Sequence, residues 1–303
     1  MTDLFALAFD HRNSMRRDFL ALTGPATAEQ SAWVRAAKEV VLDALIAAAP
    51  DVEDARCGLL LDIEYGGHLV HRAQQAGITV ALPVEVSGRD ELEFDGDFTV
   101  IAGRYAPDFI KVLVRYNPDG DGDVNARQRD KLAALASWTG AQQVPLMIEL
   151  LVPPTAKQES AVGRDYDHEL RPALSAQAIT EIAAAGVHPA LWKVEGPPTR
   201  ADAWIVTRAA LDADPSARLL VLGRGSDDSA VAAWLTVAAG TAGFAGFAIG
   251  RTVWWAPLAA WREESLGRLE AVKAVRENYL RTVRTFQGAA GSARAAGPAT
   301  GAH

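Results

Sequence analysis

The sequence predicts a single α/β domain folded as a (β/α)8 barrel, and three observations support this prediction. Eight apolar runs bounded by turn residues alternate with alanine-rich segments of helical periodicity. Strands that alternate with helices indicate right-handed βαβ units and a parallel sheet, and eight such units in about 250 residues are typical of the barrel. No glycine-rich dinucleotide fingerprint follows the first run, which disfavours the alternative of a doubly wound open sheet.

The eight predicted strands are apolar runs that end near a turn residue or a charge. They span residues 4–11, 57–65, 79–86, 109–117, 145–152, 191–196, 218–224 and 244–251. Each is an apolar run bounded by turn residues, as expected for a buried strand.

Helical patterns lie between most of the strands. They predict helices at residues 28–49, 66–76, 125–139, 175–185, 199–212 and 227–241. Residues 87–106 fit least well and predict a short acidic loop with one partial helix. Residues 257–286, rich in Arg, Glu and Leu, predict the last barrel helix and an extension. Residues 288–303 are almost all Gly, Ala, Ser and Pro, so we expect a disordered tail behind a barrel domain of residues 1–287.

The composition excludes several classes of function. The net charge of −8 argues against non-specific nucleic-acid binding. Cys57 is the only cysteine, so we expect no intrachain disulfide and no cysteine-rich zinc site. The chain has no signal-peptide pattern and no apolar run long enough to cross a membrane. We therefore expect a soluble, cytoplasmic protein without membrane contact.

Two lysines lie inside apolar runs where lysine is rare. Lys111 is in FIKVLVRY and Lys193 is in LWKVEG, and lysine is almost never fully buried without a partner or a task. A desolvated lysine has a lowered pKa, so its free amine can attack a carbonyl and form a Schiff base. The alternative is a structural ion pair with a nearby carboxylate such as Glu195. The rest of the chain favours carbonyl chemistry.

Charged residues are concentrated late in six consecutive predicted strands, where barrels of this class place their active sites. The period of two along a strand places three pairs on shared faces: Asp62 with Glu64, Lys111 with Arg115, and Lys193 with Glu195. The first, third and fifth strands add further charges at their ends: Asp10, Arg12, Glu85 and Glu149. We expect these side chains to line one functional pocket, because perturbed charged groups cluster at active sites.

The last two strands end in glycine and arginine instead. The seventh runs into Gly223, Arg224, Gly225 and Ser226, and the eighth runs into Gly250 and Arg251. In such barrels these loops often bind phosphate through backbone N–H groups and a helix N-terminus. Two ordinary glycine turns are the alternative, but their paired occurrence at the expected strands favours a phosphate site.

Together these residues suit reversible aldol cleavage of a phosphorylated ketose or keto acid. Lys193 would form the iminium, and Lys111 would help to keep Lys193 neutral by charge repulsion. Glu149 would move protons to and from the hydroxyl and the enamine. Asp10, Asp62 and Glu195 would orient the lysines or bind hydroxyls. The sequence has a poor set of metal ligands, and this chemistry requires neither a metal nor another cofactor.

The motifs resemble those of class I aldolases of the tagatose-bisphosphate and sulfofructose-phosphate type. The resemblance lies in AFDHRNSM at 8–15, FIKVLVRY at 109–116, the run around Glu149, WKVE at 192–195 and the loops at 223–225 and 250–251. It covers about residues 4–285 and is nearest to the branch of 2-deoxy-5-keto-gluconate 6-phosphate aldolase of myo-inositol catabolism. His11 departs from the tagatose type, which has Gln there, so a role for His11 is not implied.

The resemblance implies a (β/α)8 barrel with Lys193 as the Schiff-base residue and with Lys111 and Glu149 in the catalytic group. It places Arg251 and the loop at 223–226 at the phosphate, and it implies dihydroxyacetone phosphate and malonate semialdehyde as products. It also implies a homo-oligomer and a functional link to a sugar kinase, because the domain often occurs fused behind one.

Arg12 and Arg115 are cations available for a substrate carboxylate opposite the phosphate. Two other functions stay open: an aldolase for another ketose phosphate, such as sulfofructose phosphate or tagatose bisphosphate, and a non-catalytic sugar-phosphate-binding domain that partners a kinase.

Overall fold

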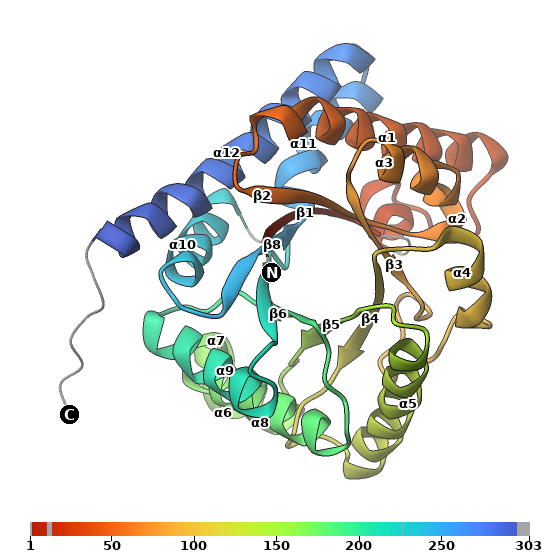
Figure 1. The fold of residues 1–303 in the computed structure, drawn as a ribbon. Helices are drawn as coiled ribbons and strands as arrows, with labels where there is room; N and C mark the ends of the chain where they lie inside the picture. The colour runs from red at the N-terminus through yellow and green to blue at the C-terminus, as the bar shows by residue number, and fades with distance from the viewer. Residues whose placement is uncertain (1, 11–13, 226, 296–303) are drawn as a thin grey trace.

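The computed structural model describes residues 2–10, 14–225 and 227–295, and it forms a closed barrel of eight parallel strands (Figure 1). The predicted fold class is confirmed: each strand pairs with the next, and β8 closes the barrel on β1. The strands are β1 (Asp3–Phe9), β2 (Ala55–Leu61), β3 (Thr79–Pro83), β4 (Phe109–Arg115), β5 (Leu146–Leu151), β6 (Leu191–Glu195), β7 (Arg218–Leu222) and β8 (Phe244–Ile249). All eight match predicted strands, and each ends one to four residues earlier than predicted.

Helices surround the barrel (Figure 1). They are α1 (Ala28–Ala48), α2 (Ile63–Gly66), α3 (Val70–Gln75), α4 (Phe98–Tyr105), α5 (Gly122–Ala141), α6 (Ala156–Val162), α7 (Tyr166–Glu169), α8 (Arg171–Ala184), α9 (Arg200–Ala213), α10 (Asp228–Ala239), α11 (Arg251–Arg262) and α12 (Arg268–Ala295). The partial helix expected within 87–106 is α4. Of the described residues, none belongs to a helix long and apolar enough to cross a membrane.

The last predicted helical region is divided between two helices. Within residues 257–286 the structure has the end of α11 and most of α12, in agreement with a last barrel helix and an extension. The predicted disordered tail from Gly288 is wrong for residues 288–295, since α12 continues to Ala295. Alanine is the strongest helix former, and the alanines in this stretch offset two glycines that cost about 1 kcal/mol each. Residues 296–303 of the predicted tail lie outside the described residues.

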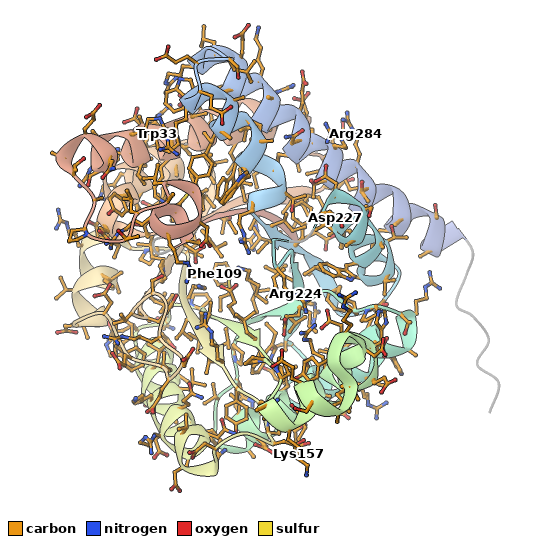
Figure 2. All side chains as sticks on the ribbon, turned by 180° about the vertical axis from the view of Figure 1, so that it is seen from behind. Trp33, Phe109, Lys157, Arg224, Asp227 and Arg284 are labelled. Atoms are coloured by element: carbon orange, nitrogen blue, oxygen red, sulfur yellow. The ribbon has the colours of Figure 1, made fainter. Side chains whose placement is uncertain are left out.

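The apolar core has two parts. A shell of buried side chains fills the space between barrel and helices. A second, smaller cluster fills the barrel itself: Leu4, Ala6, Ala8, Leu60, Ala81, Phe109, Met147, Leu191, Leu220 and Ala248. Figure 2, turned by 180°, places Phe109 near the middle of the molecule and Lys157 and Arg284 at its edge. These ten apolar side chains form a packed plug inside the barrel, and polar groups that point into the barrel lie above it, nearer the carboxyl ends of the strands.

The alternation of side chains along the strands also explains where the charged residues of the barrel lie. Because side chains alternate along a strand, the inward residue that follows Phe109 is Lys111, the one after Met147 is Glu149, and the one after Leu191 is Lys193. The same alternation points all three side chains into the barrel, each as the next inward residue after an apolar residue of the plug.

The first strand is held by hydrogen bonds from three helices. Lys38 of α1 donates to the Phe9 carbonyl at 2.5 Å, and the indole of Trp254 in α11 donates to the Ala8 carbonyl at 3.0 Å. Tyr279 of α12 donates to the Phe5 carbonyl at 2.8 Å. These bonds fix the strand end that carries Asp10.

Candidate active site

A cavity of about 510 Å³ opens at the carboxyl ends of the strands. It gathers most of the site residues predicted from the sequence: Asp10, Lys111, Arg115, Glu149, Lys193, Glu195, Gly223, Arg224, Gly225, Gly250 and Arg251. Seven of the eight strands contribute residues at or beyond their ends, and β2 does not. The cavity therefore occupies the face on which barrels of this class perform chemistry.

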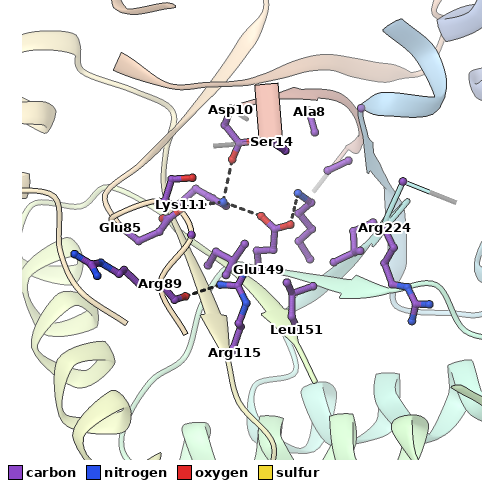
Figure 3. Close-up of a pocket in the computed structure, with 18 of the residues that line it drawn as sticks. Ala8, Asp10, Ser14, Glu85, Arg89, Lys111, Arg115, Glu149, Leu151 and Arg224 are labelled. Atoms are coloured by element: carbon purple, nitrogen blue, oxygen red, sulfur yellow. Dashed lines mark hydrogen bonds and ion pairs between the residues drawn. The ribbon is translucent and has the colours of Figure 1, made fainter. Parts of the chain in front are cut away.

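Lys111 of β4 is the centre of a buried ion cluster (Figure 3). Its Nζ atom lies 2.9 Å from Oδ2 of Asp10 and 3.0 Å from Oε1 of Glu85. It also lies 2.7 Å from Oε2 of Glu149. The Lys111 side chain is 2% exposed, so the three carboxylates, from three different strand ends, replace the water that an ammonium normally requires.

The pKa values of this cluster follow from its charges. Burial lowers the pKa of Lys111, but the negative charges of Asp10, Glu149 and Glu85 outweigh burial and raise that pKa well above its usual value. Burial raises the pKa of Glu149, but the positive charges of Lys111 and Lys193 outweigh it and bring the pKa below its ordinary value. At neutral pH Lys111 is therefore an ammonium and Glu149 a carboxylate.

Glu149 connects the two lysines. Its Oε1 atom lies 2.7 Å from Nζ of Lys193, while its Oε2 atom holds Lys111. Glu149 and Lys193 are register partners on the neighbouring strands β5 and β6, which places their side chains in contact. Lys193 is buried, and no other carboxylate among the described residues forms an ion pair with it. The arrangement can exchange a proton between Lys193 and Glu149 over one short contact.

Glu195 lies two residues beyond Lys193 and faces the same cavity. It accepts hydrogen bonds from the Val152 N–H at 2.9 Å and from Arg224 at 3.2 Å, and it forms an ion pair with Arg171 at 3.2 Å. Burial, opposed by Arg171 and the Val152 N–H and aided by Asp167, raises the pKa of Glu195 to about 7. Glu195 and Glu149 therefore differ in protonation behaviour although both line one cavity.

The predicted phosphate loops meet on one side of the cavity. Arg251 donates to the Arg224 carbonyl at 2.8 Å and forms no ion pair with any described residue. Gly225 has a φ of +74°, and a side chain there would place its Cβ 2.2 Å from the Arg251 guanidinium. Gly250 has no side chain that could cap α11, so the first N–H groups of this helix have no side-chain acceptor from its N-cap. The Arg251 guanidinium and the helix N-terminus therefore lie together, an arrangement that favours an anion.

Arg224 differs from its predicted role. Its guanidinium points away from the Lys111–Glu149 pair (Figure 3) and bonds Asp167 at 2.6 Å and Glu195 at 3.2 Å. It also lies over the Trp234 ring. Arg224 therefore contributes only its carbonyl and backbone to the loops predicted to bind phosphate, while its guanidinium pairs with two carboxylates.

Arg115 lies at the other side of the cavity. Its Nη1 atom donates to the Arg89 carbonyl at 2.7 Å (Figure 3), and it forms no ion pair with any described residue. The Arg89 carbonyl belongs to a hairpin over residues 84–95, in which Glu85 and Phe94 form an antiparallel bridge. Gln128 of α5 ties that hairpin to β4 by bonds to Leu92 and to the Arg115 carbonyl.

Two predicted site residues lie elsewhere. Asp62 does not line the cavity but is fully buried, 2.6 Å from Lys38, and caps α2 by accepting from the Tyr65 N–H. Glu64 is exposed on α2. The prediction that both share a strand face is wrong because β2 ends at Leu61 and the chain turns into a helix, where a period of two no longer applies.

Arg12, Ser226 and His11 lie outside the described residues. Two residues beside Glu195 were not predicted as site residues. Asp167 and Arg171 belong to the helical segment that follows β5. Their spacing of four is the only sequence signal, and by itself it indicates a surface ion pair on a helix. Within the described residues, no group of three or more His, Cys, Asp or Glu side chains could hold a metal ion.

The fold and site define a (β/α)8 barrel protein with two buried lysines bridged by one glutamate above an apolar plug. Residues 1–290 match the family described as "Uncharacterized protein conserved in bacteria (DUF2090)", and the chain belongs to that family. No curated protein sequence matches the chain.

Solved structures resemble the chain along most of its length. Cgl0159 of Corynebacterium glutamicum is 18% identical with a TM-score of 0.59, covering 93% of this chain and 86% of its own. Fructose-bisphosphate aldolase of Plasmodium falciparum is 16% identical with a TM-score of 0.61, covering 94% and 89%. That of Slackia heliotrinireducens is 14% identical with a TM-score of 0.54, covering 94% and 86%. Likeness at this identity shows the fold.

Proposed function

We propose that the protein is a class I aldolase that cleaves a phosphorylated keto sugar through a Schiff base on Lys193. The observation that carries the proposal is the buried contact of Glu149 with both lysines, at 2.7 Å each, above the barrel plug. The shared barrel of the two fructose-bisphosphate aldolases and the motif resemblance support the same class of reaction.

The cluster distinguishes the roles of the two lysines. Lys111 is surrounded by three carboxylates that hold its pKa high, so it remains an ammonium and is a poor nucleophile. Lys193 has a single carboxylate partner among the described residues, and that partner can remove its proton. Lys193 is therefore the nucleophile, and Lys111 keeps Glu149 anionic and oriented.

The reaction follows from these positions. Glu149 takes a proton from the Lys193 ammonium, and the freed amine attacks the ketone carbon. A proton of the attacking nitrogen moves to the former carbonyl oxygen, which becomes a hydroxyl. Glu149 returns the proton to the departing hydroxyl, which leaves as water, and an iminium remains. The carbon–carbon bond next to the iminium then breaks as Glu149 accepts the hydroxyl proton, so that an aldehyde departs and the electron pair stays as an enamine. Protonation of the enamine carbon gives an iminium again, and its hydrolysis by water releases the smaller phosphorylated ketone and restores the Lys193 amine.

The two unpaired arginines favour a substrate with an anion at each end. Arg251, beside Gly225, suits the phosphate, and Arg115 suits a carboxylate. With the motif resemblance, this favours 2-deoxy-5-keto-gluconate 6-phosphate, which gives dihydroxyacetone phosphate and malonate semialdehyde.

A substrate panel tests the proposal. Dihydroxyacetone phosphate is mixed with malonate semialdehyde, a sulfonated lactaldehyde or glyceraldehyde 3-phosphate, and its consumption is followed. We expect the fastest consumption with malonate semialdehyde, none with Lys193→Met, and wild-type rates with Lys273→Met, an exposed lysine of α12. A preference for another aldehyde would assign a different ketose phosphate, and no consumption with any would reject an aldolase.

A further inference from the structure

Four charged side chains close a ring beside Lys193. Glu195 bonds Arg224 and pairs with Arg171, each at 3.2 Å. Asp167 bonds Arg224 at 2.6 Å through one oxygen and forms a close ion pair with Arg171 through the other. Each arginine is thus shared between two carboxylates, and the ring has no net charge when Glu195 is ionised.

The groups that face Glu195 come from every element around it. They are Arg171 of α8, Asp167 and Tyr166 of α7, Arg224 of the loop after β7, Glu149 and the Val152 N–H from the β5 side, and Lys193 on its own strand. Asp167 neutralises part of the attraction that both arginines exert on Glu195. Burial, the largest influence, then raises the pKa of Glu195 to about 7, so that near neutral pH the side chain can give or take a proton.

The other carboxyls of the cavity lining either contact Lys111 or lie on the hairpin over residues 84–95. Its described lining contains no histidine, tyrosine or cysteine. Glu149 is held between the two lysines, and Lys111 contacts three carboxylates. Two carboxyls whose surroundings push their pKa values in opposite directions divide the roles of base and acid between them.

Resting on the proposed function, we propose that Glu195 is the acid–base group that moves the proton at the hydroxymethyl carbon of the Lys193-bound enamine, and that Asp167 is its positioning residue. Lys193 and Glu195 share one strand face, about 7 Å apart along the strand. That spacing leaves room for a three-carbon adduct on Nζ whose reacting carbon lies beside the carboxyl.

The proton transfer breaks one bond of Glu195 and forms one bond of the enamine. The O–H bond of the protonated Glu195 breaks and a C–H bond forms at the enamine carbon. The enamine electron pair makes this bond, the nitrogen becomes an iminium, and Glu195 becomes a carboxylate. In reverse, the carboxylate removes a proton from the iminium adduct of dihydroxyacetone phosphate and regenerates the enamine.

The reverse step can be measured without any aldehyde. The protein is incubated with dihydroxyacetone phosphate in D2O, and loss of the hydroxymethyl proton signal is followed by NMR between pH 5.5 and 8.5. Borohydride trapping of the Lys193 adduct is run in parallel. Because exchange needs the carboxylate, we expect the wild-type rate to rise with pH with a midpoint near 7.

Three variants separate the roles. Glu195→Gln should lower exchange about 100-fold or more while the adduct still forms. Asp167→Asn should move the midpoint down by about one pH unit, because it removes a negative charge that favours the protonated form. Asp212→Asn, which breaks an exposed ion pair with Arg208 on α9, should change neither.

Each of the other outcomes would contradict one part of the proposal. Exchange in Glu195→Gln within about threefold of wild type, with the adduct intact, would overturn the acid–base role. An unchanged midpoint in Asp167→Asn would overturn its positioning role, since loss of packing alone does not shift a pH profile. Neither adduct nor exchange in the wild type would reject the Schiff-base proposal, and the inference with it.

Discussion

Replacing Lys111 by methionine tests whether the buried cluster is held together by its central ammonium. The substitution keeps an unbranched side chain, one atom shorter, but removes a charge that contacts three carboxylates at 2.7–3.0 Å. Breaking a buried ion pair from one side costs about 3–5 kcal/mol, and the number of carboxylates here favours the upper half of that range. For a chain of 303 residues a loss of 4 kcal/mol lowers Tm by about 6 °C.

The loss of unfolding free energy in Lys111→Met should be larger at high pH than at low pH. The pKa of Glu149 is lowered in the folded wild type by Lys111 and Lys193, against the opposing effect of burial. A lowered pKa contributes stability that is present above the unfolded value and is lost as pH falls through the folded value. Without Lys111 the carboxylates take up protons more readily. The difference between variant and wild type should therefore be largest at pH 8 and smaller at pH 5.

Urea unfolding at both pH values, followed by circular dichroism, measures this difference. Lys131→Met is the matched control, because Lys131 pairs with the single, partly exposed carboxylate of Glu91, and such a pair contributes at most about 1 kcal/mol. A loss for Lys111→Met below about 1 kcal/mol at pH 8, or a loss no smaller at pH 5, would refute the role assigned to the cluster.

Three further substitutions have distinct expected outcomes. Arg115→Ala should raise KM for the acid substrate about 10- to 100-fold and leave the KM of dihydroxyacetone phosphate nearly unchanged; equal losses would count against a carboxylate subsite. Gly225→Ala should raise KM for dihydroxyacetone phosphate at least about tenfold, since the new Cβ would lie 2.2 Å from the Arg251 guanidinium. The control is Gly77→Ala, where φ is +75° and no atom lies within 4 Å of the new Cβ. This control should lower the unfolding free energy by about 1 kcal/mol and leave KM unchanged. Asp62→Ala should lower the unfolding free energy by about 3–5 kcal/mol and spare KM; unfolding and steady-state assays check this, and the reverse pattern would return Asp62 to the active site.

Most of the barrel could be predicted because each buried parallel strand is an apolar run that the sequence displays directly. The strand ends could not, because the runs continue into loops. The run at 57–65 illustrates this: β2 ends at Leu61, and the polar side chain of Asp62 becomes a helix cap. The period of two therefore correctly predicted which residues share a face within β4 and β6, and it failed for Asp62 and Glu64, which lie just beyond the end of β2.

The site could be predicted where its residues follow strands and not where they come from helices. Lys111, Glu149 and Lys193 are polar residues inside apolar runs, so their burial is visible in the sequence. Lys38 is equally buried, but it lies in an alanine-rich helix, where lysine is common on exposed faces. Arg171 contacts Glu195 only through the tertiary fold, and no local pattern encodes that contact.

Borohydride trapping tests the central claim most directly. The protein is incubated with dihydroxyacetone phosphate and reduced, and the mass of the intact chain and of its peptides is measured. The expected result is a covalent adduct on the peptide that contains Lys193, absent in Lys193→Met. The absence of an adduct on every lysine, with the ligand shown to bind, would contradict Schiff-base chemistry and favour a sugar-phosphate-binding domain without catalytic activity.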